Sequence, residues 1–177
     1  NRKALIGAEM LEERQQLSLT FTEFPLPPAP DPANAYRDLG TIVTGADGNL
    51  WFLQSYSDQK DASTFNLSVG RMTPTGEFAE FPITSEYYYP SSLTAGADGN
   101  LWVSTGGWIY RLTTSGHITE FKLPEGYEAQ SISVTSNGIV RFKASYYDAD
   151  FNYFVGIGRM SRSGKVGFLK VPVAMVN

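Results

Sequence analysis

The sequence contains one seven-residue stretch twice over. Residues 45–51 and residues 96–102 both read GADGNLW, and residues 135–142 read TSNGIVRF, an altered copy without the tryptophan. An Asp-Gly or Asn-Gly pair between apolar segments predicts a β-hairpin, because both central residues of a type I′ turn need positive φ. Recurrence with a period of roughly 40 to 50 residues predicts a series of four-stranded units.

Two other segments recur in step with this hairpin. The first is a strand with an arginine followed by a turn that ends in glycine, at residues 69–76, 109–116 and 157–164. The second is a Glu-Phe strand that ends near a proline, at residues 23–27, 80–83, 120–124 and, in altered form, 168–172. Since proline cannot donate to a β-ladder, we place this second segment at the outer edge of each unit.

The recurrence predicts an all-β chain built from β-propeller blades. Three four-stranded antiparallel repeats are expected at about residues 39–83, 91–123 and 130–171, after one extra outer-type strand at residues 18–25. This part of the chain is expected to form one propeller domain that extends to the last residue.

The N-terminal residues precede the predicted repeats. Residues 1–17 carry spaced apolar side chains among charged ones and predict a helix or a linker, so the propeller domain spans residues 18–177.

Because blades pack face to face, both faces of their central strands are covered. Trp51 and Trp102 are therefore expected in the core between blades.

Composition supports a β-rich chain and excludes several classes of site. Aromatic residues make up 14% of the sequence and there are 17 glycines, a mixture that suits strands joined by tight turns. The net charge of −4 gives no general attraction for nucleic acid, and the absence of cysteine excludes disulfides, thiolate metal sites and cysteine nucleophiles. No apolar run approaches the ~20 residues of a membrane span. The N-terminal residues have no initiator methionine and are interpreted as the edge of a mature or excised chain.

The repeated letters resemble those of a known family. The order A-D-G-N-L-W-F, then G-R-[MIL]-T-x-x-G, then [TA]-E-F-P-[LI]-P, over residues 18–172, is similar to the repeat of the virginiamycin B lyase (streptogramin lyase) type of β-propeller. The resemblance implies a closed ring of about seven blades. It also implies a Mg²⁺-assisted elimination that opens a cyclic depsipeptide lactone, with a histidine as base and a glutamate on the metal.

The repeat letters build the scaffold and do not carry this activity. The one histidine, His117, follows a turn glycine at the end of the second repeat that lies away from the long loops. It matches no catalytic histidine of the family, so the chain is expected to lack the catalytic base. No HExxH, P-loop or dinucleotide motif is present either. Asp148 and Asp150 could help to hold Ca²⁺, but two carboxylates make a weak site on their own, so no cofactor is predicted and Mg²⁺ or Ca²⁺ is a possibility without support in the sequence.

Three blades are too few to close a propeller. An open arc of three blades is expected to expose a broad apolar face at each end. The ring is therefore expected to be completed either by other blades of a longer protein, which we favour, or by a second copy that forms a six-bladed ring across a two-fold axis.

The longer connections at one end of every blade are rich in tyrosine and acidic residues. Tyrosine supplies rigid contact area with a polar tip, and loops on a stiff scaffold are common ligand sites. The predicted ligand-binding residues are Tyr56, Tyr87, Tyr88, Tyr89, Tyr127, Tyr146, Tyr147, Asp148 and Asp150.

We therefore predict a non-catalytic recognition domain for a glycan, a cationic ligand or a protein partner, in an extracytoplasmic setting. Two alternatives remain. The chain is a fragment of a lyase-like enzyme whose catalytic residues lie elsewhere, or it is a structural blade array of a larger surface protein.

Overall fold

The computed structural model describes residues 22–28, 35–58, 65–83, 92–147 and 152–170. Within these residues the chain forms β-strands and no helix, which confirms the predicted all-β fold. The helix or linker predicted for residues 1–17 lies outside the described residues.

Twelve described strands form three four-stranded sheets, and in each sheet neighbouring strands are consecutive and antiparallel. The first sheet contains β1 (Ala35–Thr44), β2 (Leu50–Asp58), β3 (Phe65–Met72) and β4 (Phe78–Ile83). The second contains β5 (Ser92–Ala95), β6 (Leu101–Thr105), β7 (Trp108–Leu112) and β8 (Ile118–Lys122). The third contains β9 (Tyr127–Val134), β10 (Val140–Tyr147), β11 (Tyr153–Met160) and β12 (Val166–Lys170).

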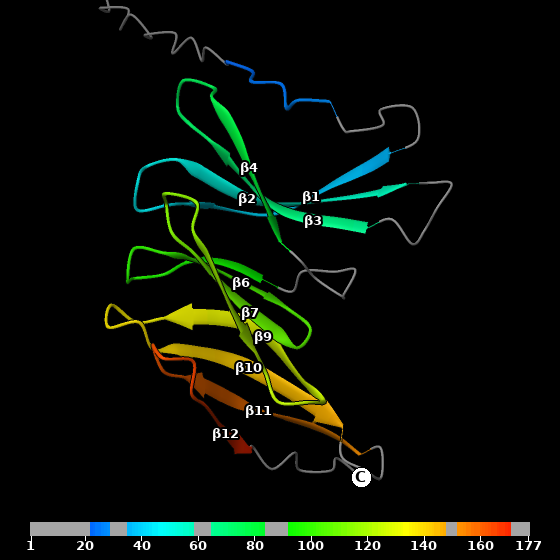
Figure 1. The fold of residues 1–177 in the computed structure, drawn as a ribbon, viewed down its shortest axis with the longest axis vertical. Helices are drawn as coiled ribbons and strands as arrows, with labels where there is room; N and C mark the ends of the chain where they lie inside the picture. Colours follow the sequence, from blue (N-terminus) through cyan, green and yellow to red (C-terminus); the bar gives the residue numbers. More distant parts are fainter. Residues whose placement is uncertain (1–21, 29–34, 59–64, 84–91, 148–151, 171–177) are drawn as a thin grey trace, which may run out of the picture.

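The three sheets follow one another along the long axis of the molecule in chain order (Figure 1). Alternate residues of β6 serve the two interfaces: Leu101 and Val103 lie in the core with the first sheet, and Trp102 lies in the core with the third. The first strands of adjacent sheets are neighbours, because β1 contacts β5 and β5 contacts β9. This is the stacking of propeller blades, with the first strand of each blade innermost.

The GADGNLW stretch forms the turn between the first two strands of a blade. The N–H of Gly48 donates to the carbonyl of Gly45 at 3.0 Å, and Gly48 has a φ of 76° while Asp47 has no positive φ. The predicted type I′ geometry is therefore wrong. The hydrogen bond closes a turn over residues 45–48, and Gly48 alone in this turn has a left-handed backbone conformation. The connection is therefore a turn with a single glycine bulge.

Neighbouring blades interlock through a repeated contact between phenylalanine and glycine. A Cβ added to Gly116 in the β7–β8 turn would collide with the ring of Phe81 on β4, and one added to Gly164 would lie 2.8 Å from the ring of Phe121. The ring of Phe24 lies against Gly76 in the same way. Phe24 therefore takes the place of an outer-strand phenylalanine from a preceding blade.

The described part of this extra segment has no strand pairing. Residues 22–28 form no ladder with another segment, since no third strand of a preceding blade lies beside them in the described structure. The position of Phe24 nevertheless matches the predicted role of the segment as the outer strand of an additional blade.

The face of the third sheet that points away from the second sheet differs from the prediction. An apolar face was expected at each end of the arc, but Arg141 and Lys143 are exposed on β10. Apolar exposure on this face lies further out, at Ile157 of β11 and Leu169 of β12. The prediction of an apolar end face is therefore wrong for the inner half of this sheet.

Candidate ligand-binding site

A hollow of about 550 Å³ opens beside the short β6–β7 turn. This turn consists only of Gly106 and Gly107, whereas residues 59–64 separate β2 from β3 and residues 148–152 separate β10 from β11. The connection between the second and third strands is therefore shortest in the second blade. A volume of about 300 to 1,000 Å³ is usual for a small-molecule site.

Backbone hydrogen bonds hold the rim of the hollow. The carbonyl of Gly107 accepts from the N–H of Leu123 at 2.8 Å, and the carbonyl of Gly106 accepts from the N–H of Ala129 at 3.0 Å. The N–H of Tyr127 donates to the carbonyl of Pro124 at 3.1 Å. The β8–β9 connection is thereby tied to the β6–β7 turn, so this wall is formed before any ligand binds.

Aromatic and charged side chains line the hollow together. Trp108 and Tyr147 supply aromatic surface, and Tyr147 is 61% exposed. The Lys122 ammonium lies 5.3 Å from the centroid of the Trp108 ring. Glu125 and Glu128 are exposed and add two carboxylates. The site therefore offers apolar faces for stacking beside hydrogen-bond donors and acceptors.

Two of the predicted tyrosines have a structural role. Tyr127 stacks on Phe168 with ring centroids 4.0 Å apart and on Tyr146 with centroids 4.6 Å apart. Tyr146 in turn stacks on Phe154 at 5.0 Å. This aromatic row joins the outer strand of the third blade to its first strand, so most of the ring surface of Tyr127 and Tyr146 is used within the protein.

Tyr147 and Tyr56 lie in contrasting environments. Tyr147 borders the hollow and packs on Tyr153 with centroids 5.1 Å apart. Tyr56 is 5% exposed, and its hydroxyl accepts from the Arg37 guanidinium at 2.6 Å. Burial and the nearby Glu80 carboxylate raise the pKa of Tyr56 above 10.0, against the opposing effect of Arg37. Tyr56 is thus held by the protein itself, away from the hollow.

The remaining predicted site residues lie outside the described residues. They are Tyr87, Tyr88, Tyr89, Asp148 and Asp150. The structure therefore places Tyr127 and Tyr147 together at one hollow and leaves these five without a structural test.

Trp108 and Lys122 of the hollow were not among the predicted residues. Trp108 begins β7 directly after Gly107, so in the sequence it reads as a strand residue of the core. The only signal in the sequence is the two-residue turn beside it, which is much shorter than its counterparts in the other repeats.

Among the described residues, no three carboxylate, histidine or cysteine side chains lie close enough to hold a metal ion. His117 is exposed in the β7–β8 turn, where its backbone N–H donates to the Thr113 hydroxyl at 3.0 Å. No helix in the described part of the chain has the length and hydropathy of a membrane span.

Comparison with known proteins gives one family and several solved structures. The model of the virginiamycin B lyase family matches residues 15–176. A streptogramin B lyase structure is 17% identical and aligns over 80% of this chain and 75% of that chain, with a TM-score of 0.40. Virginiamycin B lyase from Staphylococcus aureus is 18% identical over 82% of this chain and 73% of that chain, with a TM-score of 0.40. A candidate gluconolactonase is 19% identical over 76% of this chain and 48% of that chain, with a TM-score of 0.47. No curated protein matches the sequence.

Proposed function

The chain belongs to the virginiamycin B lyase family, and we propose that it is a recognition module that binds a carbohydrate in the hollow beside the β6–β7 turn. The observation that carries this proposal is the joint lining of the hollow by Trp108, Tyr147, Glu125 and Glu128. A sugar ring presents an apolar face that stacks on aromatic rings and hydroxyls that need acceptors, and this lining offers both.

A sugar fits this lining better than a cationic ligand or a protein surface. The Lys122 ammonium already lies 5.3 Å from the centre of the Trp108 ring, so a second cation would meet a like charge there. At about 550 Å³ the hollow has the volume of a small-molecule site. Neutral hydroxyls, in contrast, can accept from Lys122 and donate to the two glutamates.

Membership of the family favours a second candidate, a fragment of a lyase that breaks a C–O bond. The described residues do not fit the Mg²⁺ that this activity implies, because they contain no cluster of three metal-ligating side chains. The single histidine lies in the β7–β8 turn, at the opposite end of the blade from the hollow. Metal-assisted catalysis would therefore depend on residues outside the described part of the chain.

A glycan array followed by titration of the bound sugar tests the proposal. Trp108→Ala should weaken sugar binding by about tenfold or more, since a loss of ~1.4 kcal/mol corresponds to a factor of ten. Tyr147→Ala should also weaken it, whereas His117→Ala, at the opposite end of the blade, should not. Array binding that survives both aromatic substitutions, or an array without any bound sugar, would contradict the proposal.

The lyase candidate has a separate test. Incubation of the full chain and Mg²⁺ with a cyclic depsipeptide lactone, followed by mass spectrometry, should leave the ring closed if the chain lacks the catalytic base. Opening of the ring by this chain alone would show that it is an enzyme.

A further inference from the structure

The outward face of the third sheet keeps part of a blade-to-blade interface and changes the rest. We call this surface the C-terminal face and define it by Arg141, Lys143, Ile157, Arg159 and Leu169, all of which are exposed. The corresponding face of the first sheet is buried against the second sheet.

Strand register identifies the equivalent positions. Leu169 pairs with Ile157 on the third sheet, as Phe81 pairs with Val69 on the first. Val69 is completely buried between the first two sheets, and Phe81 packs there, whereas Ile157 is 48% exposed and Leu169 is 66% exposed. The outer half of the C-terminal face thus retains the apolar positions that contact a following blade.

The arginine of the repeat is also retained. In the first sheet the Arg71 guanidinium lies 5.7 Å from the Trp51 ring centroid and donates to the Thr114 carbonyl in the next blade at 3.3 Å. Arg159 has the same place in the third sheet, because it pairs with Arg141 just as Arg71 pairs with Trp51. An arginine that reaches the following blade in one interface is therefore present, and exposed, at the next.

The inner half of the face has changed from apolar to cationic. Arg141 replaces the tryptophan, and Lys143 stands where the first sheet has Leu53, which is 2% exposed in the core. Arg141 and Arg159 are directly opposite one another, and like charges in that position are destabilising. No ion pair to Arg141, Lys143 or Arg159 occurs among the described residues; Lys143 donates to the Gln130 amide oxygen at 3.3 Å.

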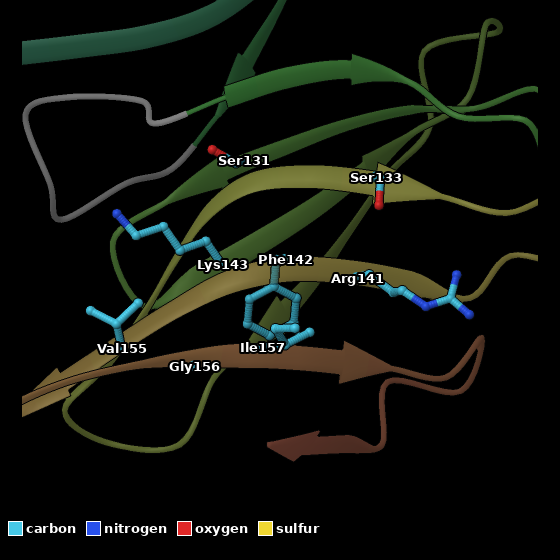
Figure 2. A pocket seen from close by; sticks show the side chains of 8 residues that line it. All are labelled: Ser131, Ser133, Arg141, Phe142, Lys143, Val155, Gly156 and Ile157. Atoms are coloured by element: carbon cyan, nitrogen blue, oxygen red, sulfur yellow. The ribbon is translucent and has the colours of Figure 1, made fainter. Parts of the chain in front are cut away.

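A groove of about 420 Å³ crosses this inner half (Figure 2). Lys143 and Arg141 extend in opposite directions along β10, and Ile157 lies between them in the same view. Ser131 and Ser133 border the groove on β9. Its surroundings therefore combine an apolar centre with cationic ends and hydroxyls, a composition suited to carboxylates on a sheet face.

From this pattern we infer that the C-terminal face docks a further β-blade whose first two strands carry carboxylates opposite Arg141 and Lys143. Leu169, Ile157 and Arg159 repeat the positions that join the first two blades, which identifies the partner as a blade. The two new cations define its chemistry, because they reject the apolar face that packs on Trp51 and require acidic groups instead.

A second copy of this chain does not meet these requirements. The face of its first sheet is the one that a further blade would present, but Phe24 already lies against Gly76 at the site of a preceding outer strand. A complete third sheet would bring β12 to the place that residues 22–28 hold. The partner blade is therefore supplied by a different polypeptide segment.

An additional blade joined to the full chain tests the inference. The probe is a copy of residues 91–123 fused after residue 177, either unchanged or with glutamates at the positions of Leu93 and Val103, which face the preceding sheet in the parent blade. The acidic probe should raise the Tm of the chain by several degrees at low salt, and added salt should reduce this gain. The unchanged probe should give no such gain.

The reciprocal variant keeps the test decisive if the acidic probe fails to fold. R141W/K143L restores the residues of the first sheet, so the unchanged probe should now stabilise the chain and the acidic probe should not. Equal stabilisation by both probes, or a preference that R141W/K143L leaves unaltered, would overturn the inference. Sedimentation of the chain by itself gives a further test. A dimer that dissociates in the Arg141→Glu variant would show that a second copy is the partner and would overturn the inference that the blade comes from a different polypeptide segment.

Discussion

The indole N–H of Trp51 donates a hydrogen bond to Oδ1 of Asp47 at 3.0 Å, and Trp102 donates to Oδ1 of Asp98 at 3.1 Å. The same carboxylate of Asp47 accepts from the side-chain amide of Asn49 at 2.7 Å. Gly45 has no side chain because a Cβ there would lie 2.5 Å from the Trp51 indole nitrogen. The repeated seven residues thus form a single device that ties a surface turn to a ring in the core between blades.

Removal of the Asp47 carboxylate should weaken the first blade. Asp47→Ala leaves the buried Trp51 indole N–H without its acceptor, and a hydrogen bond to a charged group contributes about 1.5 to 3 kcal/mol. Because Asp47 is itself exposed, we expect a loss of about 1 to 2 kcal/mol in the free energy of unfolding, measured by urea denaturation. Asp98→Ala should have a similar effect in the second blade, and no loss in either variant would contradict the role of the device.

The Asp47 carboxylate should make the free energy of unfolding depend on pH in the acidic range. Burial acts to raise the pKa of Asp47, but the hydrogen bonds from Trp51 and Asn49 outweigh it and hold the pKa below 3.8. A lowered pKa in the folded state stabilises the protein above about 3.8, and this stabilisation is lost as pH falls through the lowered value. The stability difference between the wild type and Asp47→Asn should therefore shrink below pH 3.8 in urea titrations.

Phe81 and Leu169 occupy equivalent positions and should differ sharply in their contribution to stability. Phe81 stacks on Trp51 with centroids 5.4 Å apart and packs on Gly116 of the next blade, whereas Leu169 is 66% exposed. Phe81→Ala should lower the free energy of unfolding by about 2 to 3 kcal/mol. Leu169→Ala should change it by less than about 0.5 kcal/mol. Equal effects in thermal unfolding would show that the Phe81 interlock does not stabilise the blades.

The Phe52–Gly70 pair predicts a destabilising substitution and its rescue. These residues are paired across β2 and β3, and a Cβ on Gly70 would collide with the Phe52 ring. Gly70→Ala should therefore cost about 1 to 3 kcal/mol through overpacking. The second blade has Val103 and Tyr110 at the equivalent pair, so F52V should recover part of the loss in the double variant. If the changes in the free energy of unfolding caused by the two single substitutions simply added in the double variant, this steric explanation would be excluded.

Tyr56 should make the protein less stable in alkali. Burial is the main reason that its pKa lies above 10.0, with a further rise from Glu80 and an opposing effect from Arg37. A raised pKa stabilises the folded state below 10.0, and this contribution is lost as pH rises through the folded value. Tyr56→Phe should lose less stability than the wild type above pH 10.0. The phenolate absorbance of the wild type should include a late-titrating tyrosine that is absent from the variant.

The repeat explains how much of the fold could be predicted. The GADGNLW copies, the arginine strands and the Glu-Phe strands mark the same three positions in each unit, so four strands, their order and the buried Trp51 and Trp102 follow from local periodicity. The turn type did not follow, because an Asp-Gly pair suits both a type I′ turn and a turn with one glycine bulge. The hydrogen bond between Gly48 and Gly45 decides between them.

The candidate site was predicted only in part. Tyr127 and Tyr147 were named from the tyrosine-rich connections, but Tyr127 uses its ring within an aromatic row, and Trp108 and Lys122 were missed. Tyrosine content shows where aromatic groups gather along the chain. It does not show which rings pack on each other, since that depends on side chains from strands distant in sequence.

The sequence by itself determined the blades, because strand and turn propensities act locally and the same pattern of residues occurs three times in the chain. It also marked Phe24 as an outer-strand residue of an additional blade. Only the tertiary structure decided which surfaces are open. The hollow brings together Trp108, Lys122 and Tyr147 from separate strands, and Arg141 and Lys143 face outward because register places them at the positions of Trp51 and Leu53. Exposure is a property of what lies next to a side chain in space, so it could be read only after the sheets were stacked.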